Sequence, residues 1–144
     1  RLNYTPFSFE QGHEYISSLT PDKEDWDIVF TSYTYVYYDL EEITPYQVTG
    51  VLLNPHNVRA IEEDNVLFED IDLEYASGIS LANKLDVIGF DWKYYNFEEG
   101  YYSVLSDQSY IIQDVEGVYY KLRFVDFYDD NGVKGAPKFE FQKL

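Results

Sequence analysis

Apolar and polar positions alternate most clearly at the end of the chain. Two runs there, Val118–Phe124 and Lys138–Gln142, place aromatic and aliphatic residues at every second position. A period of two is typical of a strand with one buried face. The turn Asp114–Gly117 can join Tyr110–Gln113 to the first of these runs as a hairpin. The chain is therefore predicted to end in an antiparallel meander.

The same signature recurs upstream in shorter runs. They are Tyr4–Phe9, Trp26–Phe30 with an extended continuation through Tyr33, Tyr35 and Tyr37, Tyr46–Leu53, Val58–Ile61, Phe90–Phe97 and Tyr101–Leu105. Pro6 predicts an edge position for the first run, because proline lacks the backbone donor that a central strand needs.

Residues 62–75 are the least certain part of this pattern, and Ile79–Ala82 is ambiguous. Phe68, Ile71 and Tyr75 fall at roughly helical spacing, which predicts one or two helical turns. No repeat, low-complexity tract or linker is present. We therefore predict one domain over residues 1–144, mostly β and antiparallel, built of many short strands.

Trp26 is predicted to anchor the core. It shares the alternation of Ile28 and Phe30, which would place all three on one strand face, with Asp25 and Asp27 on the other.

The residue inventory excludes several classes of chemistry. The chain has no Cys and no Met, and its only histidines are His13 and His56. The absence of Cys excludes a disulfide framework and thiolate catalysis. The two histidines leave almost no residues for a Ser-His-Asp triad or a multi-histidine metal centre. No apolar run is long enough to span a membrane.

The net charge limits the classes of partner that the protein can bind. The net charge is −17, and such a surface repels nucleic acid and anionic membranes, which both attract Lys and Arg. We expect no nucleic-acid partner and interpret the acidic surface as one that keeps a protein with 16 Tyr and 10 Phe soluble.

Neighbouring acids do not predict an enzyme or a metal site. Pairs such as Glu98-Glu99 lie in turn-like segments, whereas general acid–base catalysis needs carboxylates held in a cleft. The segment Asp126–Pro137 lacks the alternating ligands and distant glutamate of a calcium loop, and is predicted to be a solvated connection. We expect no enzymatic activity and no metal site.

The aromatic run Trp92–Phe97 has two interpretations. It is either a core strand with one wet face, or the wall of a site for a flat apolar ligand, with Lys93 available for a carboxylate. His56 in the turn Asn54–Asn57 is either an exposed turn residue or an axial ligand. The residues alone leave both alternatives open, although a bare turn histidine is the more common case.

Several segments together resemble the HmuY family of Bacteroidetes surface lipoproteins, some of which are haemophores. The carrying segments are Phe7–Phe9, Asp25–Phe30, Gly89–Lys93 and the terminal block with Tyr110–Ile112, Gly117–Phe124, Phe127-Tyr128, Gly132, Lys134-Gly135, Pro137 and Phe139-Glu140. The family fold is all β, which agrees with the prediction from periodicity.

The resemblance implies an extracytoplasmic protein. The family carries a signal peptide, a lipidated cysteine just upstream of the domain, and display at the cell surface or outer membrane. The chain begins at Arg1 without a visible signal peptide, which fits a sequence cut after such an anchor. Membrane attachment would then be through that lipid alone.

The resemblance also implies haem as ligand and an outer-membrane receptor as partner in iron acquisition. Family ligands are His or Met, and the Gly89–Lys93 motif places Tyr95 at one ligand position. The second maps near residues 62–68, and no His or Met follows His56. Tyrosinate can hold haem iron. Candidate haem-binding residues are Tyr95, with Tyr94, Trp92 and Phe97 as wall, Lys93 or Arg59 for a propionate, and His56. The alternative is a surface interaction domain that keeps the fold without the haem site.

Overall fold

The computed structural model describes residues 4–14, 24–39 and 42–144. Ten strands and two short helical segments follow one another along this part of the chain. They are β1 (Tyr4–Ser8), β2 (His13–Glu14), β3 (Ile28–Tyr37), β4 (Thr44–Leu53), β5 (Arg59–Glu63), the 3-10 turn η1 (Phe68–Asp70), α1 (Leu73–Gly78), β6 (Lys93–Asn96), β7 (Tyr101–Val104), β8 (Ser109–Gln113), β9 (Tyr119–Tyr128) and β10 (Lys134–Lys143).

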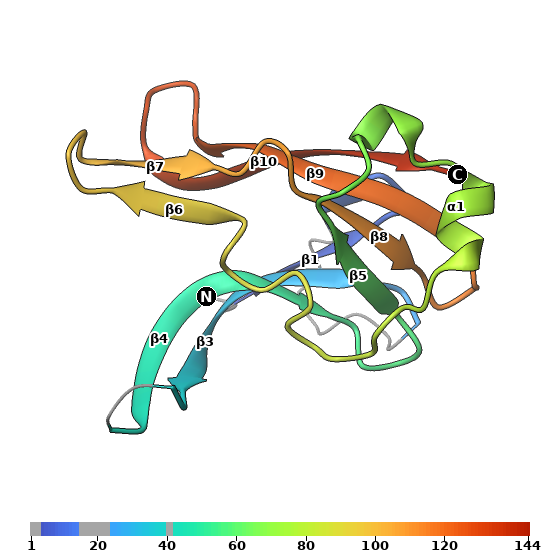
Figure 1. The fold of residues 1–144 in the computed structure, drawn as a ribbon, viewed down its shortest axis with the longest axis horizontal. Coiled ribbons are helices and arrows are strands. Elements are labelled where there is room, and N and C mark those ends of the chain that lie inside the picture. Colours follow the sequence, from blue (N-terminus) through green and yellow to red (C-terminus); the bar gives the residue numbers. More distant parts are fainter. Residues whose placement is uncertain (1–3, 15–23, 40–41) are drawn as a thin grey trace.

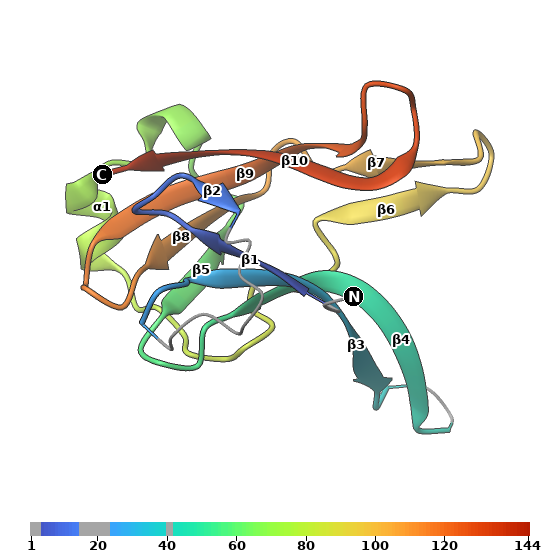
Figure 2. The same cartoon turned by 180° about the vertical axis from the view of Figure 1, so that it is seen from behind.

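The strands form two four-stranded sheets and one two-stranded ribbon. One sheet has the order β2-β1-β3-β4, the other β10-β9-β8-β5, and β6 pairs with β7. Among the described residues, all paired strands run antiparallel. The predicted mostly β, antiparallel fold is confirmed. Figures 1 and 2 show the β3–β4 hairpin and the β6–β7 hairpin extending toward the same end of the molecule, with β5, β8 and α1 toward the opposite end.

The two predicted segments around Ile28–Tyr37 and Tyr46–Leu53 pair as one long hairpin, β3–β4. Its register is continuous from Ile28↔Leu53 to Tyr37↔Thr44. The strand β4 therefore begins before the predicted Tyr46, whereas β3 begins after the predicted Trp26 and runs without a break to Tyr37. Beside them, β1 has neighbours on both sides, yet Pro6 itself pairs only with β3, because the β1–β2 register begins at Phe7. Proline is thus placed where no partner on the second side needs its missing N–H.

The C-terminal meander forms as predicted, with two register shifts between β9 and β10. Tyr120, Leu122 and Phe124 of β9 face the core. Between Lys138↔Asp126 and Phe139↔Phe124 the register shifts, so β9 carries one extra residue at Val125. This bulge resets the alternation, so that Phe127 also faces the core. The strands β9 and β10 extend into the predicted 126–137 connection, of which residues 129–133 remain as turn.

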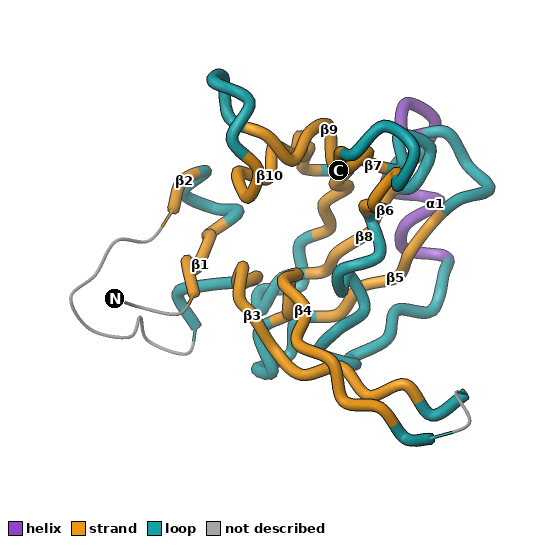
Figure 3. The backbone as a smooth tube through the Cα atoms, turned by 90° about the vertical axis from the view of Figure 1, so that its left-hand side faces the viewer, coloured by secondary structure: helices purple, strands orange, loops and turns teal. Residues whose placement is uncertain are grey.

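The second sheet is covered on its outer face by η1 and α1, which form the predicted helical turns. Figure 3 shows these segments beside β5 on the side away from β1. Ile71 and Ala76 pack on Ile111 in a second apolar cluster. Lys121, expected on a wet face, is buried there and donates hydrogen bonds to the Phe68 and Ile71 carbonyls at 2.7 and 2.9 Å. These hydrogen bonds replace those that the ammonium group would make with water if it were exposed.

The Trp26 prediction is wrong. Trp26 precedes β3 and is only half-buried, whereas Asp27, predicted to face outward, is 5% exposed. Asp27 Oδ2 accepts a hydrogen bond from Phe9 N at 3.0 Å, so the carboxylate is turned inward to satisfy a buried backbone donor. The strand β3 begins at Ile28, whereas the sequence pattern places its start at Trp26.

Within the described residues, no helix is long and apolar enough to cross a membrane.

Candidate functional site

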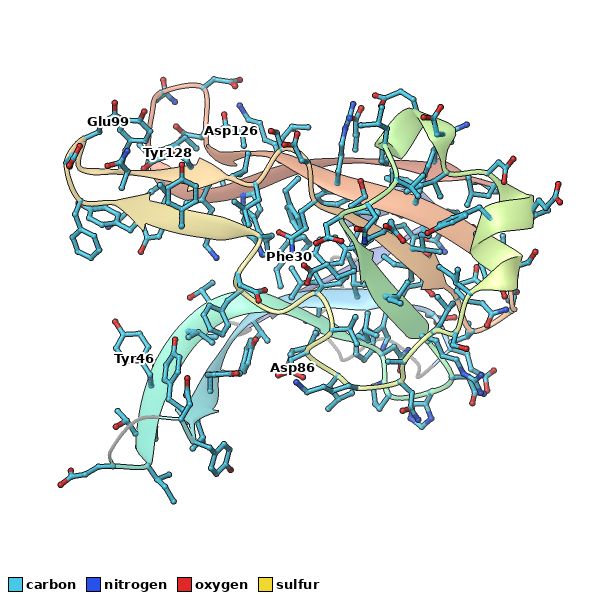
Figure 4. All side chains as sticks on the ribbon, in the orientation of Figure 1. Phe30, Tyr46, Asp86, Glu99, Asp126 and Tyr128 are labelled. Atoms are coloured by element: carbon cyan, nitrogen blue, oxygen red, sulfur yellow. The ribbon has the colours of Figure 1, made fainter. Side chains whose placement is uncertain are left out.

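A cleft of about 430 Å³ lies between the two projecting hairpins. Its residues come from β3, β4, β6, β7, β9, the start of β10 and the segment before β6. They are Tyr37, Tyr46, Gln47, Val48, Thr49, Phe90, Lys93, Tyr102, Phe127, Lys134 and Gly135. In Figure 4, Tyr46 projects from β4 on the side of the β6–β7 hairpin. A volume of several hundred Å³ with aromatic walls is typical of a small-molecule site.

One wall of the cleft is a tyrosine stripe on the β3–β4 hairpin. Tyr35 pairs with Tyr46 across the two strands, so they share a face with Tyr33 and Tyr37, two residues away along β3. Phe90 packs edge-on against this stripe, with its ring centroid 5.1 Å from that of Tyr35. The stripe is therefore both packed at its base and open toward the tip, where Tyr46 is exposed.

The β6–β7 hairpin forms the opposite wall and divides its aromatic side chains between two faces. Tyr95 pairs with Tyr102, and Lys93 lies two residues before Tyr95, so these three share the cleft face. Tyr94 lies on the other face. Tyr95 does not itself line the cleft. Its ring centroid is 5.1 Å from that of Tyr102, and its hydroxyl points toward the Gly100 turn. Tyr95 thus sits at the outer margin of the cleft, with exposed Phe97 beyond it.

Lys93 is the cation at the base of the cleft. Its Nζ donates to the carbonyls of Thr49 and Phe90 at 3.0 and 3.2 Å, and lies 4.2 Å from the Trp92 ring centroid. Burial lowers the pKa of Lys93 to about 8, and the negative charge of Asp91 works against that shift. Among the described residues no carboxylate forms a salt bridge with Lys93. The ammonium therefore faces the cleft without a paired anion.

Trp92 belongs to the core rather than to an open wall. It is 2% exposed and stacks on Phe124 with centroids 3.9 Å apart. Its edge still lines a smaller hollow of about 220 Å³, which shares Thr49, Phe127 and Gly135 with the cleft. The indole Nε1 has no hydrogen-bond partner among the described residues.

Backbone hydrogen bonds hold the segment that leads into the β6–β7 hairpin against β4. Gly89 N and O exchange hydrogen bonds with Val51 O and N at 3.1 and 2.8 Å. A Cβ at Gly50 would lie 2.3 Å from the Gly89 carbonyl oxygen, so this approach requires glycine. At the far end of the ribbon, Tyr128 and Tyr102 are joined by a hydrogen bond of 2.8 Å from the Tyr102 backbone N–H (Figure 4 labels Tyr128).

The remaining predicted site residues lie elsewhere. His56 lines a separate hollow of about 240 Å³ with Glu24, Asn57, Val115 and Glu116. Arg59 is exposed on β5 and pairs with Gln113. No residue of 62–68 lines the cleft, and Phe68 instead lies under Lys121 and Arg123. Figure 1 shows β5 at the other end of the molecule from the β6–β7 tip. The described residues hold no group of three His, Cys, Asp or Glu side chains that could bind a metal ion.

Several cleft residues were not predicted from the sequence. Tyr37, Tyr46, Phe90, Tyr102 and Lys134 line it without having been singled out. For Tyr102 a signal exists, because the Glu98–Gly100 turn sets Tyr102 opposite Tyr95 in a two-stranded ribbon. For Tyr46 and Lys134 no local signal exists, since the contact depends on how the two hairpins are placed in space.

The part of the chain from α1 to β10 carries a family match. Residues 72–141 match the family model described as HmuY protein. The resemblance to the HmuY family is confirmed. The matched residues include Lys93, Tyr95, Tyr102, Phe127 and Lys134, so they contribute one wall and the floor of the cleft.

Two solved structures share the fold, and a third gives a lower TM-score. An apo HmuY analog from Tannerella forsythia gives a TM-score of 0.55 at 14% identity, covering 97% of this chain and 88% of that chain. A candidate lipoprotein from Bacteroides fragilis gives 0.54 at 14% identity, covering 96% and 80%. A candidate HmuY-like heme-binding protein from Bacteroides vulgatus gives 0.45 at 16% identity, covering 96% and 83%. Among curated proteins, none matches the chain.

Proposed function

We propose that this protein is an extracytoplasmic haem-binding protein of the HmuY type, and that haem lies in the cleft between the β3–β4 and β6–β7 hairpins. The observation that carries the proposal is the chemistry of the lining. Aromatic rings and two lysines surround the cleft, and none of its lining residues is acidic, in a chain with 27 Asp and Glu. A flat apolar ring bearing carboxylates is complementary to such walls.

Iron ligation would fall to oxygen. The ring hydroxyls at or beside the cleft belong to Tyr37, Tyr46, Tyr95 and Tyr102. Phenolate is a known haem ligand, and it forms when ferric iron displaces the phenol proton. Tyr95, at the position that the family resemblance indicates, is the proposed ligand, with Tyr102 beside it. Ferrous iron is softer and less charged, so the ferrous state should bind phenolate less strongly.

The proposed role is binding rather than catalysis, with haem as cargo passed to an outer-membrane receptor and the chain held at the cell surface by an upstream lipid. The family match and the shared fold support this assignment. A second candidate function, a haem-free interaction domain, is favoured by one observation. Tyr94, Phe97 and Tyr101 are exposed on the β6–β7 hairpin, and such a patch can also contact a protein.

The test is a haemin titration followed by Soret absorbance, before and after reduction with dithionite. Wild type should give a saturable shift at one haem per chain, stronger in the ferric state. Tyr95→Phe and Tyr102→Phe should alter the ferric spectrum. Tyr94→Phe is the matched control, because its ring lies on the opposite face of the same strand. No Soret shift in wild type would leave the interaction domain as the better account, and a shift that only Tyr94→Phe disturbs would move the site to the other face.

A further inference from the structure

The strand β4 forms an outer edge of the first sheet, and β3 is its one partner strand among the described residues (Figure 2). Near its end, Val51 exchanges two backbone hydrogen bonds with Gly89 on the side away from β3. Over residues 45–49 no strand in the described part of the chain continues this pairing. That stretch of β4 is therefore an open strand edge.

The backbone groups of this edge can be assigned by alternation. Val51 points its N–H and C=O away from β3, and Thr49 O accepts a hydrogen bond from Lys93 Nζ at 3.0 Å on the same side. Because successive residues of a strand point their backbone groups in opposite directions, Gln47 and Pro45 share this orientation. The groups left open are the Thr49 N–H, both backbone groups of Gln47 and the Pro45 carbonyl.

These groups are complementary to a second copy of the same edge. With Gln47 opposite Gln47 of the copy in an antiparallel pair, the two residues exchange both backbone hydrogen bonds. Thr49 then lies opposite Pro45 of the copy, and its N–H donates to the proline carbonyl. The proline has no N–H to offer, and the Thr49 carbonyl that would receive one already accepts from Lys93. In this register every outward backbone group of residues 45–49 has a partner.

The charge distribution favours contact at this edge. Two copies with a net charge of −17 repel each other, yet β3 and β4 contain no Asp, Glu, Lys or Arg in a chain with 26% charged residues. The edge strand β10, by contrast, carries Lys134, Lys138 and Lys143 and two register shifts, features that oppose edge-to-edge pairing. The β4 edge lacks this protection.

The side chains fit the same register. Tyr46 is 61% exposed, and the pairing places it opposite Val48 of the copy, on the face that carries the tyrosine stripe. An aromatic ring and a β-branched side chain form a favourable pair across two antiparallel strands. The symmetry repeats the pair on the other side of Gln47. Association would therefore cover a large side chain that the single chain leaves exposed.

We propose that two copies of this chain associate through the outer edges of β4, antiparallel and centred on Gln47, so that their four-stranded sheets join into one continuous sheet. The interface is isologous, since the same residues meet across a two-fold axis. Gln47 and Thr49 also line the cleft, so a paired copy covers its opening along β4. The inference does not rest on haem binding, and its test uses protein without ligand.

The association is measured by sedimentation velocity at protein concentrations from about 5 to 500 µM. Wild type should dimerise with a dissociation constant of about 10–100 µM, as for a small interface with few hydrogen bonds. Gln47→Lys sets two like charges opposite each other and should weaken the dimer by about tenfold or more, although it lowers the net negative charge. Thr34→Lys is the matched control. Thr34 pairs with Gln47 on β3, one strand from the edge, and its change should alter the constant by less than about twofold.

A cysteine variant tests the register. The chain has no Cys, so Gln47→Cys introduces a single thiol. Directly opposed, hydrogen-bonded residues have Cα atoms about 5.5 Å apart, within the range of a disulfide. Mild oxidation should convert most of the Gln47→Cys protein into a covalent dimer. Thr34→Cys places its thiol one strand further from the axis and should give little.

The outcomes decide the inference. A wild type that stays monomeric over the whole concentration range overturns it. A dimer that Gln47→Lys leaves intact also overturns it, as does equal cross-linking of the two cysteine variants, because the contact would then lie on another surface. Circular dichroism checks that each variant is folded, and if Gln47→Lys does not fold, the cross-linking comparison decides alone.

Discussion

Asp27 offers the sharpest test of the packing between the N-terminal strands and the core. Burial raises the pKa of this carboxyl from 3.8 to about 6, the hydrogen bond from Phe9 N partly opposes that shift, and the negative charges of Asp114, Glu10 and Glu116 add to it. The folded protein therefore holds a proton on Asp27 more tightly than the unfolded chain does. The stability contributed by protonated Asp27 is fully present below pH 3.8 and is lost as the pH rises through about 6.

The size of the effect follows from the shift. Each pKa unit corresponds to about 1.4 kcal/mol, so the ionised carboxylate costs up to about 3 kcal/mol at neutral pH. Asp27→Asn keeps an oxygen acceptor for Phe9 N and removes the charge. Its NH₂ group needs a new partner in a buried position, which offsets part of the gain. We expect a net stabilisation of about 1–2 kcal/mol at pH 7.5 and almost none at pH 4.5.

The assay is urea unfolding followed by circular dichroism from pH 4.5 to 7.5. The slope of unfolding free energy against pH should be flatter in Asp27→Asn than in wild type. Asp25→Asn is the matched control, since Asp25 is exposed two residues away and its change lowers the acidic charge equally. If Asp27→Asn is no more stable than wild type at pH 7.5, or if Asp25→Asn stabilises as much, the burial argument is refuted.

Three further predictions concern the frame of the site. Trp92→Ala should lower the free energy of unfolding in urea by about 3–5 kcal/mol, because it removes the ring that stacks on Phe124. Trp26→Ala, at a half-buried position, should lower it clearly less. Similar losses would contradict the placement of Trp92 as the core residue. Gly50→Ala should lose about 1–3 kcal/mol because its Cβ meets a backbone carbonyl at 2.3 Å, while Gly78→Ala, with open space around it, should not destabilise; a stable Gly50→Ala protein would show that the β6–β7 hairpin can move away from β4. Calcium at millimolar concentration should leave the melting temperature unchanged, because Asp129 already accepts from Asn131 N and Val133 N; micromolar affinity abolished by Asp129→Asn would contradict this.

Local alternation predicted most of the strands because their side chains are sorted by one apolar face. Tyr120, Leu122 and Phe124 occupy the core as their period of two indicates. The sequence could not show that Lys121, on the other face, is covered as well. That burial depends on η1 and α1 returning over β9, a contact about 50 residues away in the chain. Phe124 and Phe127 do carry a readable signal, since a spacing of three within a strand indicates a bulge.

The candidate site was only partly predictable. The run Trp92–Phe97 was predicted to be either a core strand or a ligand wall. In the structure Trp92 packs in the core, whereas the residues that follow form β6 of the projecting ribbon. Lys93 was correctly placed beside an aromatic surface, and its lack of a carboxylate partner among described residues follows only from the tertiary structure. Arg59 and His56 were grouped with Tyr95 by chemical type alone, and the fold separates them from the cleft.

The two walls of the cleft have different origins in the sequence, and this bears on where specificity resides. The family match begins at residue 72 and so includes the β6–β7 hairpin, the Lys93 floor and the start of β10, but not the tyrosine stripe of β3 and β4. In the proposed function, the ribbon would supply the iron ligand Tyr95, and Lys93 would supply a positive charge at the floor. The stripe supplies ring contacts through Tyr37 and Tyr46, and ring stacking tolerates many planar partners. If haem binds as proposed, the matched residues would contribute the iron ligand and the positive charge, while the β3–β4 wall would adjust how deeply and how tightly the ring is held.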